Sequence, residues 1–222
     1  MDRRAFLVLI PFRILTGLQT KGRATLVKEI REHDTVIVLG ETGSGKTTRE
    51  SGGNSSSPSL KRHLEVPQFL LEANFAVNGA IACTQPRRVA ATSLAARVAA
   101  EQGVNVGSRV GYAVRFDERS SVDTKIKYLT DGMLVRELLG DPLLSKYSVI
   151  VIDEAHERTL RTDVLLASLK GIQRTRNTPM DPNGKTPERF NPLKIVIMSA
   201  TLDAERFSRY YDKSVYALPS SF

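Results

Sequence analysis

A glycine-rich segment with one lysine is the clearest place in this 222-residue chain where residue types and spacing imply chemistry. The segment is Gly40-Glu-Thr-Gly-Ser-Gly-Lys46-Thr47, and it directly follows the apolar run 35–39. Glycines allow a tight turn whose successive N–H groups point inward at phosphate oxygens. Lys46 would place a positive charge on the β- and γ-phosphates, and the Thr47 hydroxyl is a hard ligand for Mg²⁺. The pattern predicts a nucleoside triphosphate site. The alternative is a glycine-rich turn with an exposed lysine.

Two adjacent carboxylates form a second candidate site. The apolar run 149–152 is followed at once by Asp153, Glu154 and, two residues later, His156. A buried parallel strand that ends in carboxylates places both at the edge of the sheet where nucleotides bind. Asp153 would hold Mg²⁺ through water, and Glu154 would polarise the attacking water. The alternative is an acidic pair that only caps a helix. The predicted phosphate loop in the same chain favours the nucleotide site over this alternative.

Together these segments resemble the motifs of DEAH-box RNA helicases of superfamily 2. The matching stretches are GETGSGKTT at 40–48, TQPRRVAA at 84–91, DEAH at 153–156 and SAT at 199–201, in the order of the family. The resemblance covers most of residues 21–218 and corresponds to the first RecA-like domain of these enzymes.

The resemblance implies that ATP and Mg²⁺ are the cofactors. Metal binding would fall to Thr47, Asp153 and Glu154, and catalysis to these two carboxylates with His156 and Lys46. Arg97 matches the arginine that stacks on adenine, with an exposed helical arginine as the alternative. The full set that would hold the nucleotide is Gly40, Glu41, Thr42, Gly43, Ser44, Gly45, Lys46, Thr47, Thr48 and Arg97.

The resemblance also implies an RNA path and a coupling motif. Guanidinium groups suit phosphate oxygens, so the paired arginines of TQPRR fit a nucleic-acid backbone. The resemblance also implies that Ser199 and Thr201 couple nucleotide state to unwinding. Small hydroxyls suit this role, since they can hydrogen-bond to Asp153 or His156. The simpler alternative is helix capping for the paired arginines and for Ser199 and Thr201, and a plain helix start for Thr130. The residues matched to single-stranded RNA are Thr84, Arg87, Arg88, Arg115, Phe116 and Thr130.

Continuous apolar runs, rather than alternating ones, indicate strands of a parallel sheet buried on both faces. Helix-like stretches between them favour an α/β fold with ligands at the carboxyl ends of the strands. The family implies a RecA-like P-loop NTPase domain, a mostly parallel sheet sandwiched between helices. Expected strands are 35–39, 79–83, 109–114, 125–129, 147–152 and 194–198; expected helices are 24–32, 88–102, 131–139 and 162–173.

The expected organisation is an N-terminal extension at 1–20 and an ATP-binding domain at 21–218. The Gly/Ser-rich segment 49–65 predicts a flexible insert, which would interrupt the helix behind the phosphate loop. Residues 175–191 predict a surface loop. Nothing resembles the second RecA-like domain or the C-terminal domains, so we expect an incomplete chain that does not unwind RNA alone.

The composition of the chain indicates which classes of partner it binds. The net charge of +8 favours a polyanion, although scattered surface lysines would give the same balance. Cys83 is the only cysteine, which excludes an intrachain disulfide, and no apolar run reaches the ~20 residues of a membrane span. The family implies a nuclear or nucleolar location, with the cytoplasm as the alternative, and protein activators that bind further domains. The leading interpretation is the ATP-binding lobe of an RNA helicase; the alternative is a catalytically inactive nucleic-acid-binding module.

Overall fold

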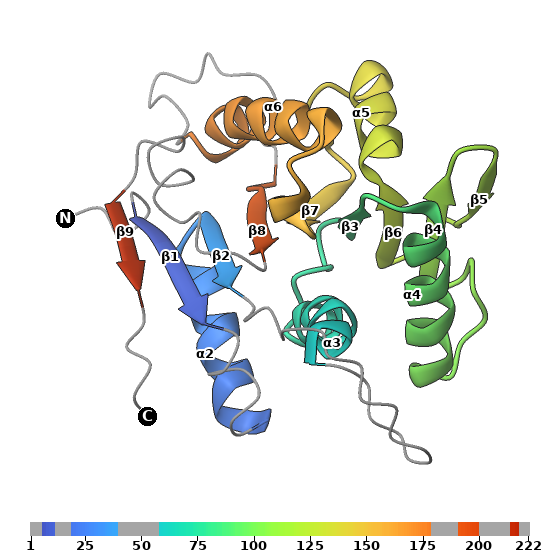
Figure 1. Cartoon of the computed structure of the whole chain (residues 1–222), viewed down its shortest axis with the longest axis horizontal. Coiled ribbons are helices and arrows are strands. Elements are labelled where there is room, and N and C mark those ends of the chain that lie inside the picture. Colours follow the sequence, from blue (N-terminus) through green and yellow to red (C-terminus); the bar gives the residue numbers. More distant parts are fainter. Residues whose placement is uncertain (1–5, 12–18, 40–57, 179–190, 200–213, 218–222) are drawn as a thin grey trace.

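The computed structural model describes residues 6–11, 19–39, 58–178, 191–199 and 214–217. These residues form one nine-stranded sheet with helices on both faces (Figure 1). In chain order the elements are β1 Phe6–Pro11, α2 Gln19–Glu32, β2 Thr35–Leu39, α3 Pro58–Glu72, β3 Ala80–Gln85, α4 Arg88–Glu101, β4 Val110–Val114, β5 Asp117–Arg119, β6 Ile126–Thr130, α5 Asp131–Gly140, β7 Tyr147–Ile152, the 3-10 turn η2 Ala155–Glu157, α6 Leu160–Asn177, β8 Lys194–Ser199 and β9 Ser214–Ala217.

The strands lie in the order β5-β4-β6-β3-β7-β8-β2-β1-β9. Every neighbouring pair is parallel except β4 and β5, which form an antiparallel hairpin at one side. All other strands therefore end at the same edge, called here the carboxyl edge. The opposite edge is called the amino edge.

Both faces of the sheet carry a hydrophobic core. Val36 and Val38 of β2 pack in the cluster that includes α2, α3 and α4, whereas Ile37 between them packs in the cluster of α5 and α6. Figure 1 shows the same division, with α2, α3 and α4 on one face and α5 and α6 on the other. Burial on both faces explains why the strands are continuous apolar runs.

The predicted α/β class, the mostly parallel sheet and the helices on both faces are confirmed. All six expected strands and all four expected helices are present, with ends that shift by a few residues. Residues 6–11, placed by sequence in an N-terminal extension, form β1, and Val8 to Pro11 pair with Val36 to Leu39 of β2.

The flexible loop expected over 49–65 is wrong for its last eight residues, because α3 begins at Pro58. Proline is favoured at a first helical position, where its missing N–H is not needed. The loop expected over 175–191 is also wrong at its start, because α6 continues to Asn177. The rest of the insert lies outside the described residues. Within the described part of the chain, no helix is long and apolar enough to cross a membrane.

Candidate functional site

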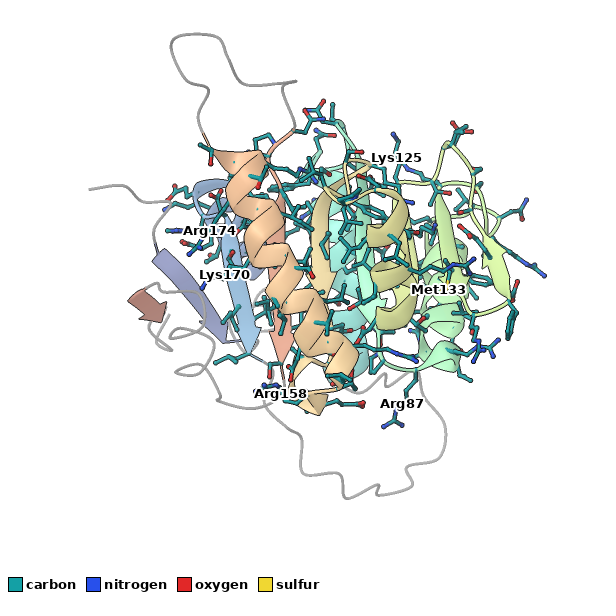
Figure 2. The ribbon with its side chains drawn as sticks, turned by 90° about the horizontal axis from the view of Figure 1, so that it is seen from above. Arg87, Lys125, Met133, Arg158, Lys170 and Arg174 are labelled. Carbon is teal, nitrogen blue, oxygen red and sulfur yellow. The ribbon has the colours of Figure 1, made fainter. Side chains whose placement is uncertain are left out.

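The carboxyl edge brings together most of the described residues that the sequence singled out. In the sheet register, Thr84 of β3 is beside Ile152 of β7, and Gln85 is beside Thr130 of β6. On the other side of β7, Ser199 of β8 is beside Leu39, the last residue of β2. Figure 2 shows Arg87 and Arg158 at this end of the molecule and Lys125 at the opposite end. Strand ends from across the chain thus meet at one surface.

Asp153 is 1% exposed and lies directly after β7. Its Oδ2 accepts a hydrogen bond from Gln85 Nε2 at 2.5 Å, and its Oδ1 accepts one from the Glu154 backbone N–H at 2.7 Å. Two donors from different directions hold this carboxylate in one orientation at the centre of the edge.

The backbone of Glu154 is in the left-handed region, with φ 51° and ψ 35°. This conformation is unfavourable for a residue with a Cβ, and such residues often occur at functional sites. The chain then enters η2, which brings His156 Nε2 within 3.3 Å of Glu154 Oε2. About a quarter of each side chain is exposed, so the pair can reach a bound ligand.

A cavity of about 540 Å³ opens beside this pair, a volume in the range typical of small-molecule sites. It connects Glu154 with Arg97 of α4, which the sequence assigned to adenine. Arg97 Nε also pairs with Glu101 Oε1 at 3.0 Å. The cavity is lined by Gln85, Pro86, Arg87, Ala90, Ser93, Leu94, Arg97, Glu154 and Glu157.

Arg87 and Arg88 are exposed at the start of α4. Arg87 occupies the N-cap position, but its side chain makes no capping hydrogen bond and instead pairs with Glu157 Oε1 at 3.2 Å. Helix capping by Arg87, the simpler alternative from the sequence, therefore does not occur. Thr84 differs from its neighbours in the motif, since it is wholly buried and its hydroxyl does not reach the surface.

Arg115 and Phe116 form the turn of the β4–β5 hairpin, between the paired residues Val114 and Asp117. Phe116 has φ 68° and is 88% exposed. The Arg115 guanidinium carbon lies 4.7 Å from the centre of the Phe116 ring. An aromatic ring in solvent on a strained turn provides a flat surface for a stacked base.

Thr130 is the N-cap of α5, and the following Asp131 is almost wholly buried. Thr162 Oγ1 of α6 donates to Asp131 Oδ2 at 2.5 Å, so the first turns of α5 and α6 are joined. Burial raises the pKa of Asp131 above its ordinary value.

Some sequence predictions fall outside the described residues. They are the phosphate loop Gly40–Thr48, including Lys46 and Thr47, and Thr201. Ser199 is described and is wholly buried at the end of β8. The sequence analysis did not assign a role to Gln85, which orients Asp153. Its position as a polar residue at the end of a parallel strand, next to Thr84, could have indicated one.

The described residues contain no group of three or more His, Cys, Asp or Glu side chains arranged for a metal. A magnesium ion bound to a nucleotide needs fewer, because it keeps several waters and uses one or two carboxylates plus phosphates. Asp153 and Glu154 supply hard oxygens of this kind and fit such an ion.

Comparison with known proteins gives strong relatives. The chain is 45% identical over 214 residues to the Arabidopsis thaliana protein named pre-mRNA-splicing factor ATP-dependent RNA helicase DEAH10, covering 84% of this chain. It is 46% identical over 192 residues to the Homo sapiens ATP-dependent RNA helicase DHX33, covering 86% of this chain. It is 45% identical over 191 residues to the Rattus norvegicus probable ATP-dependent RNA helicase DHX40, again covering 86% of the chain. No family model matches the chain. The alignments cover 28%, 24% and 21% of these relatives' lengths, respectively.

Proposed function

Because this chain belongs to the family of DEAH-box ATP-dependent RNA helicases, we propose that it forms the ATP-binding lobe of such an enzyme. In the intact protein, this lobe would couple ATP hydrolysis to the remodelling of RNA. The observation that carries the proposal is the position of Asp153 and Glu154 at the carboxyl end of β7. The strand β2, which leads directly into the lysine-bearing glycine loop, ends at the same edge.

Each of the assigned residues has a defined role in this proposal. Lys46 and the glycine-loop N–H groups bind the phosphates. Asp153, oriented by Gln85 and by the Glu154 N–H, would hold Mg²⁺ together with Thr47. When bound, Mg²⁺ neutralises charge on the phosphates during their transfer. Glu154 orients the attacking water and accepts its proton, and His156 holds the Glu154 carboxylate through their contact.

RNA would bind along the same edge, beyond the nucleotide. Arg87 and Arg88 lie exposed at the start of α4, and Arg115 and Phe116 project from the β4–β5 turn. Guanidinium groups bind backbone phosphates and the exposed ring stacks on a base, so recognition would be largely independent of sequence. The net charge of +8 supports such binding over a wider surface.

The compartment and the protein partners are part of the same proposal. A nuclear or nucleolar location and activation by a protein that contacts other domains are what family membership suggests. A fluorescent fusion of the protein imaged in cells tests the location, and exclusion of the signal from the nucleus would contradict it.

The proposal is tested by titrating the chain with a fluorescent ATP analogue and Mg²⁺. Lys46→Ala should weaken binding by about tenfold or more, because it removes the charge opposite the terminal phosphates. The control is Lys28→Ala, an exposed lysine on α2 that should bind like the wild type. Equal affinity of the wild type and Lys46→Ala would reject the nucleotide site.

A second titration separates the motor lobe from a nucleic-acid-binding module without activity. In the proposed function, the affinity for single-stranded RNA changes when the ATP analogue is present, because both ligands bind the same edge. RNA affinity that is sensitive to salt but indifferent to nucleotide would favour the inactive module instead.

A further inference from the structure

A second cavity at the carboxyl edge is lined by three arginines from three different elements. Its volume is about 280 Å³, and it lies where α5 and α6 begin. Arg115 comes from the β4–β5 turn, Arg136 from α5 and Arg161 from the first turn of α6. Thr130 and Gly132 line it too. Only Arg115 and Thr130 were assigned to RNA by sequence.

The charge in this cavity is uncompensated by the described part of the chain. No Asp or Glu side chain is among its described lining residues, and Arg115, Arg136 and Arg161 form no ion pair with any described residue. Asp131, the nearest acidic residue in sequence, is buried and hydrogen-bonded to Thr162 instead. Like charges around one space repel one another unless an anion joins them. The arrangement therefore fits an anionic ligand.

The start of α5 adds to the preference for an anion. Its N-cap residue Thr130 makes no side-chain capping hydrogen bond. The first N–H groups of a helix have no partner within the helix and carry partial positive charge. Thr130 and Gly132, from this end of the ten-residue helix, line the same cavity as the three arginines.

Gly132 explains how Arg161 reaches the cavity. A Cβ built on Gly132 would lie 3.1 Å from Arg161 Nη1 and 3.3 Å from Arg161 Cδ. The guanidinium therefore lies directly against the first turn of α5, in space that any larger residue would occupy. Arg136 follows Gly132 by four residues, so it projects from the same face of the helix.

We propose that Arg136 and Arg161 join Arg115 to form a binding site for a backbone phosphate of single-stranded RNA at the start of α5 and α6. This inference rests on the proposed function, since it adds residues to the same RNA surface. Phe116 favours RNA over an acidic peptide, because its exposed ring beside Arg115 offers a stacking surface next to the phosphate site.

The test measures how the affinity for labelled oligouridine depends on salt, by fluorescence anisotropy between about 50 and 200 mM KCl. Each arginine that binds a phosphate should contribute about 0.7 to the slope of log affinity against log salt. Arg161→Gln and Arg136→Gln should each lower the slope by about that amount and weaken binding about threefold to tenfold. The weakening should be equal for oligoadenine, because phosphate contacts carry no base information.

The matched control is Arg109→Gln. Arg109 is an exposed arginine at the amino end of β4, the strand whose carboxyl end leads into Arg115. It should keep the wild-type slope. A further variant, Gly132→Ala, should also weaken RNA binding, because its methyl group displaces the Arg161 guanidinium, while alanine favours the helix.

The outcomes are distinguishable. If the wild type shows salt-dependent RNA binding but Arg136→Gln, Arg161→Gln and Gly132→Ala match the Arg109→Gln control, the phosphate site is overturned and the proposed function stands. If the wild type shows no such binding, the phosphate site and the RNA-binding part of the proposed function are both rejected, and the ATP-analogue titration alone decides the nucleotide site. Thermal melting of each variant verifies folding, and if one arginine variant fails to fold, the other and Gly132→Ala decide.

Discussion

The two edges of the sheet are both rich in charged side chains, but they use them differently. At the amino edge, Glu137 accepts hydrogen bonds from Lys127 at 3.1 Å and Tyr147 at 2.8 Å, and it pairs with Lys146 at 3.0 Å. Lys127 is in turn bonded to Glu118 at 2.7 Å. At the carboxyl edge, three arginines line a cavity with no described ion-pair partner. The amino-edge cluster neutralises its own charges, whereas the cavity at the carboxyl edge leaves its three arginines available to a ligand, although other cations of that edge, such as Arg87, are paired.

Arg176, also on the amino-edge side, is a basic side chain whose donors are all used within the protein. It is 4% exposed, and its guanidinium donates to the backbone carbonyls of Leu143, Leu144, Tyr147 and Asn191. Burial lowers its pKa from the ordinary value. This side chain joins the end of α6 to the segments before β7 and β8. Such an arginine contributes to the stability of the fold rather than to ligand binding. A basic side chain therefore indicates a binding site only when its partners within the protein are known.

The largest expected effect tests this reading of Arg176. Arg176→Leu should lower the free energy of unfolding by about 3 kcal/mol, because several buried carbonyls lose their donor. Urea unfolding followed by circular dichroism measures the change. Arg174→Leu, an exposed position on the same helix, should change it by less than about 0.5 kcal/mol. Similar losses in both variants would contradict the contrast between the edges.

An intermediate effect is expected at the carboxyl edge from Phe116→Gly. Glycine accepts the positive φ of this turn, so thermal stability should be kept or slightly raised. Loss of the exposed ring should weaken RNA binding by about tenfold, because one stacked base loses its partner. Anisotropy titration and thermal melting measure the two quantities.

The control for this variant is Val122→Gly, which removes an exposed apolar side chain near the amino edge. It should leave RNA affinity unchanged. RNA binding by Phe116→Gly that equals that of the wild type would remove the ring from the proposed RNA path.

The smallest effect concerns Asp131, where the carboxyl edge meets the core. Because its pKa is raised in the folded protein, the favourable contribution of the protonated form is present below the unfolded pKa and is lost as pH rises through the folded value. Asp131→Asn, which can still accept from Thr162, should therefore be slightly more stable than the wild type at pH 7. Melting curves at several pH values should show this advantage shrinking toward pH 4; a constant difference would contradict the sign.

The prediction from sequence was most complete where a residue follows a buried strand. Asp153 and Thr130 could be placed at one edge because parallel strands end together, and the apolar runs that precede them are readily recognised. Pro58 at the start of α3 was missed because polar residues around it hid a helix that packs on the sheet. Thr84 was assigned to RNA by its motif, but its place in the strand buries it.

The sequence by itself determined the α/β class, the strands, the family and the identity of the acidic and basic residues near their ends. These follow from local patterns, since a strand buried on both faces must be apolar along its whole length. Only the tertiary structure decided that Gln85 orients Asp153, that Gly132 makes room for Arg161, and that Arg176 is a buried donor. These contacts join residues far apart in the chain, and spacing along a sequence carries no information about side chains that meet only when helices pack on a sheet.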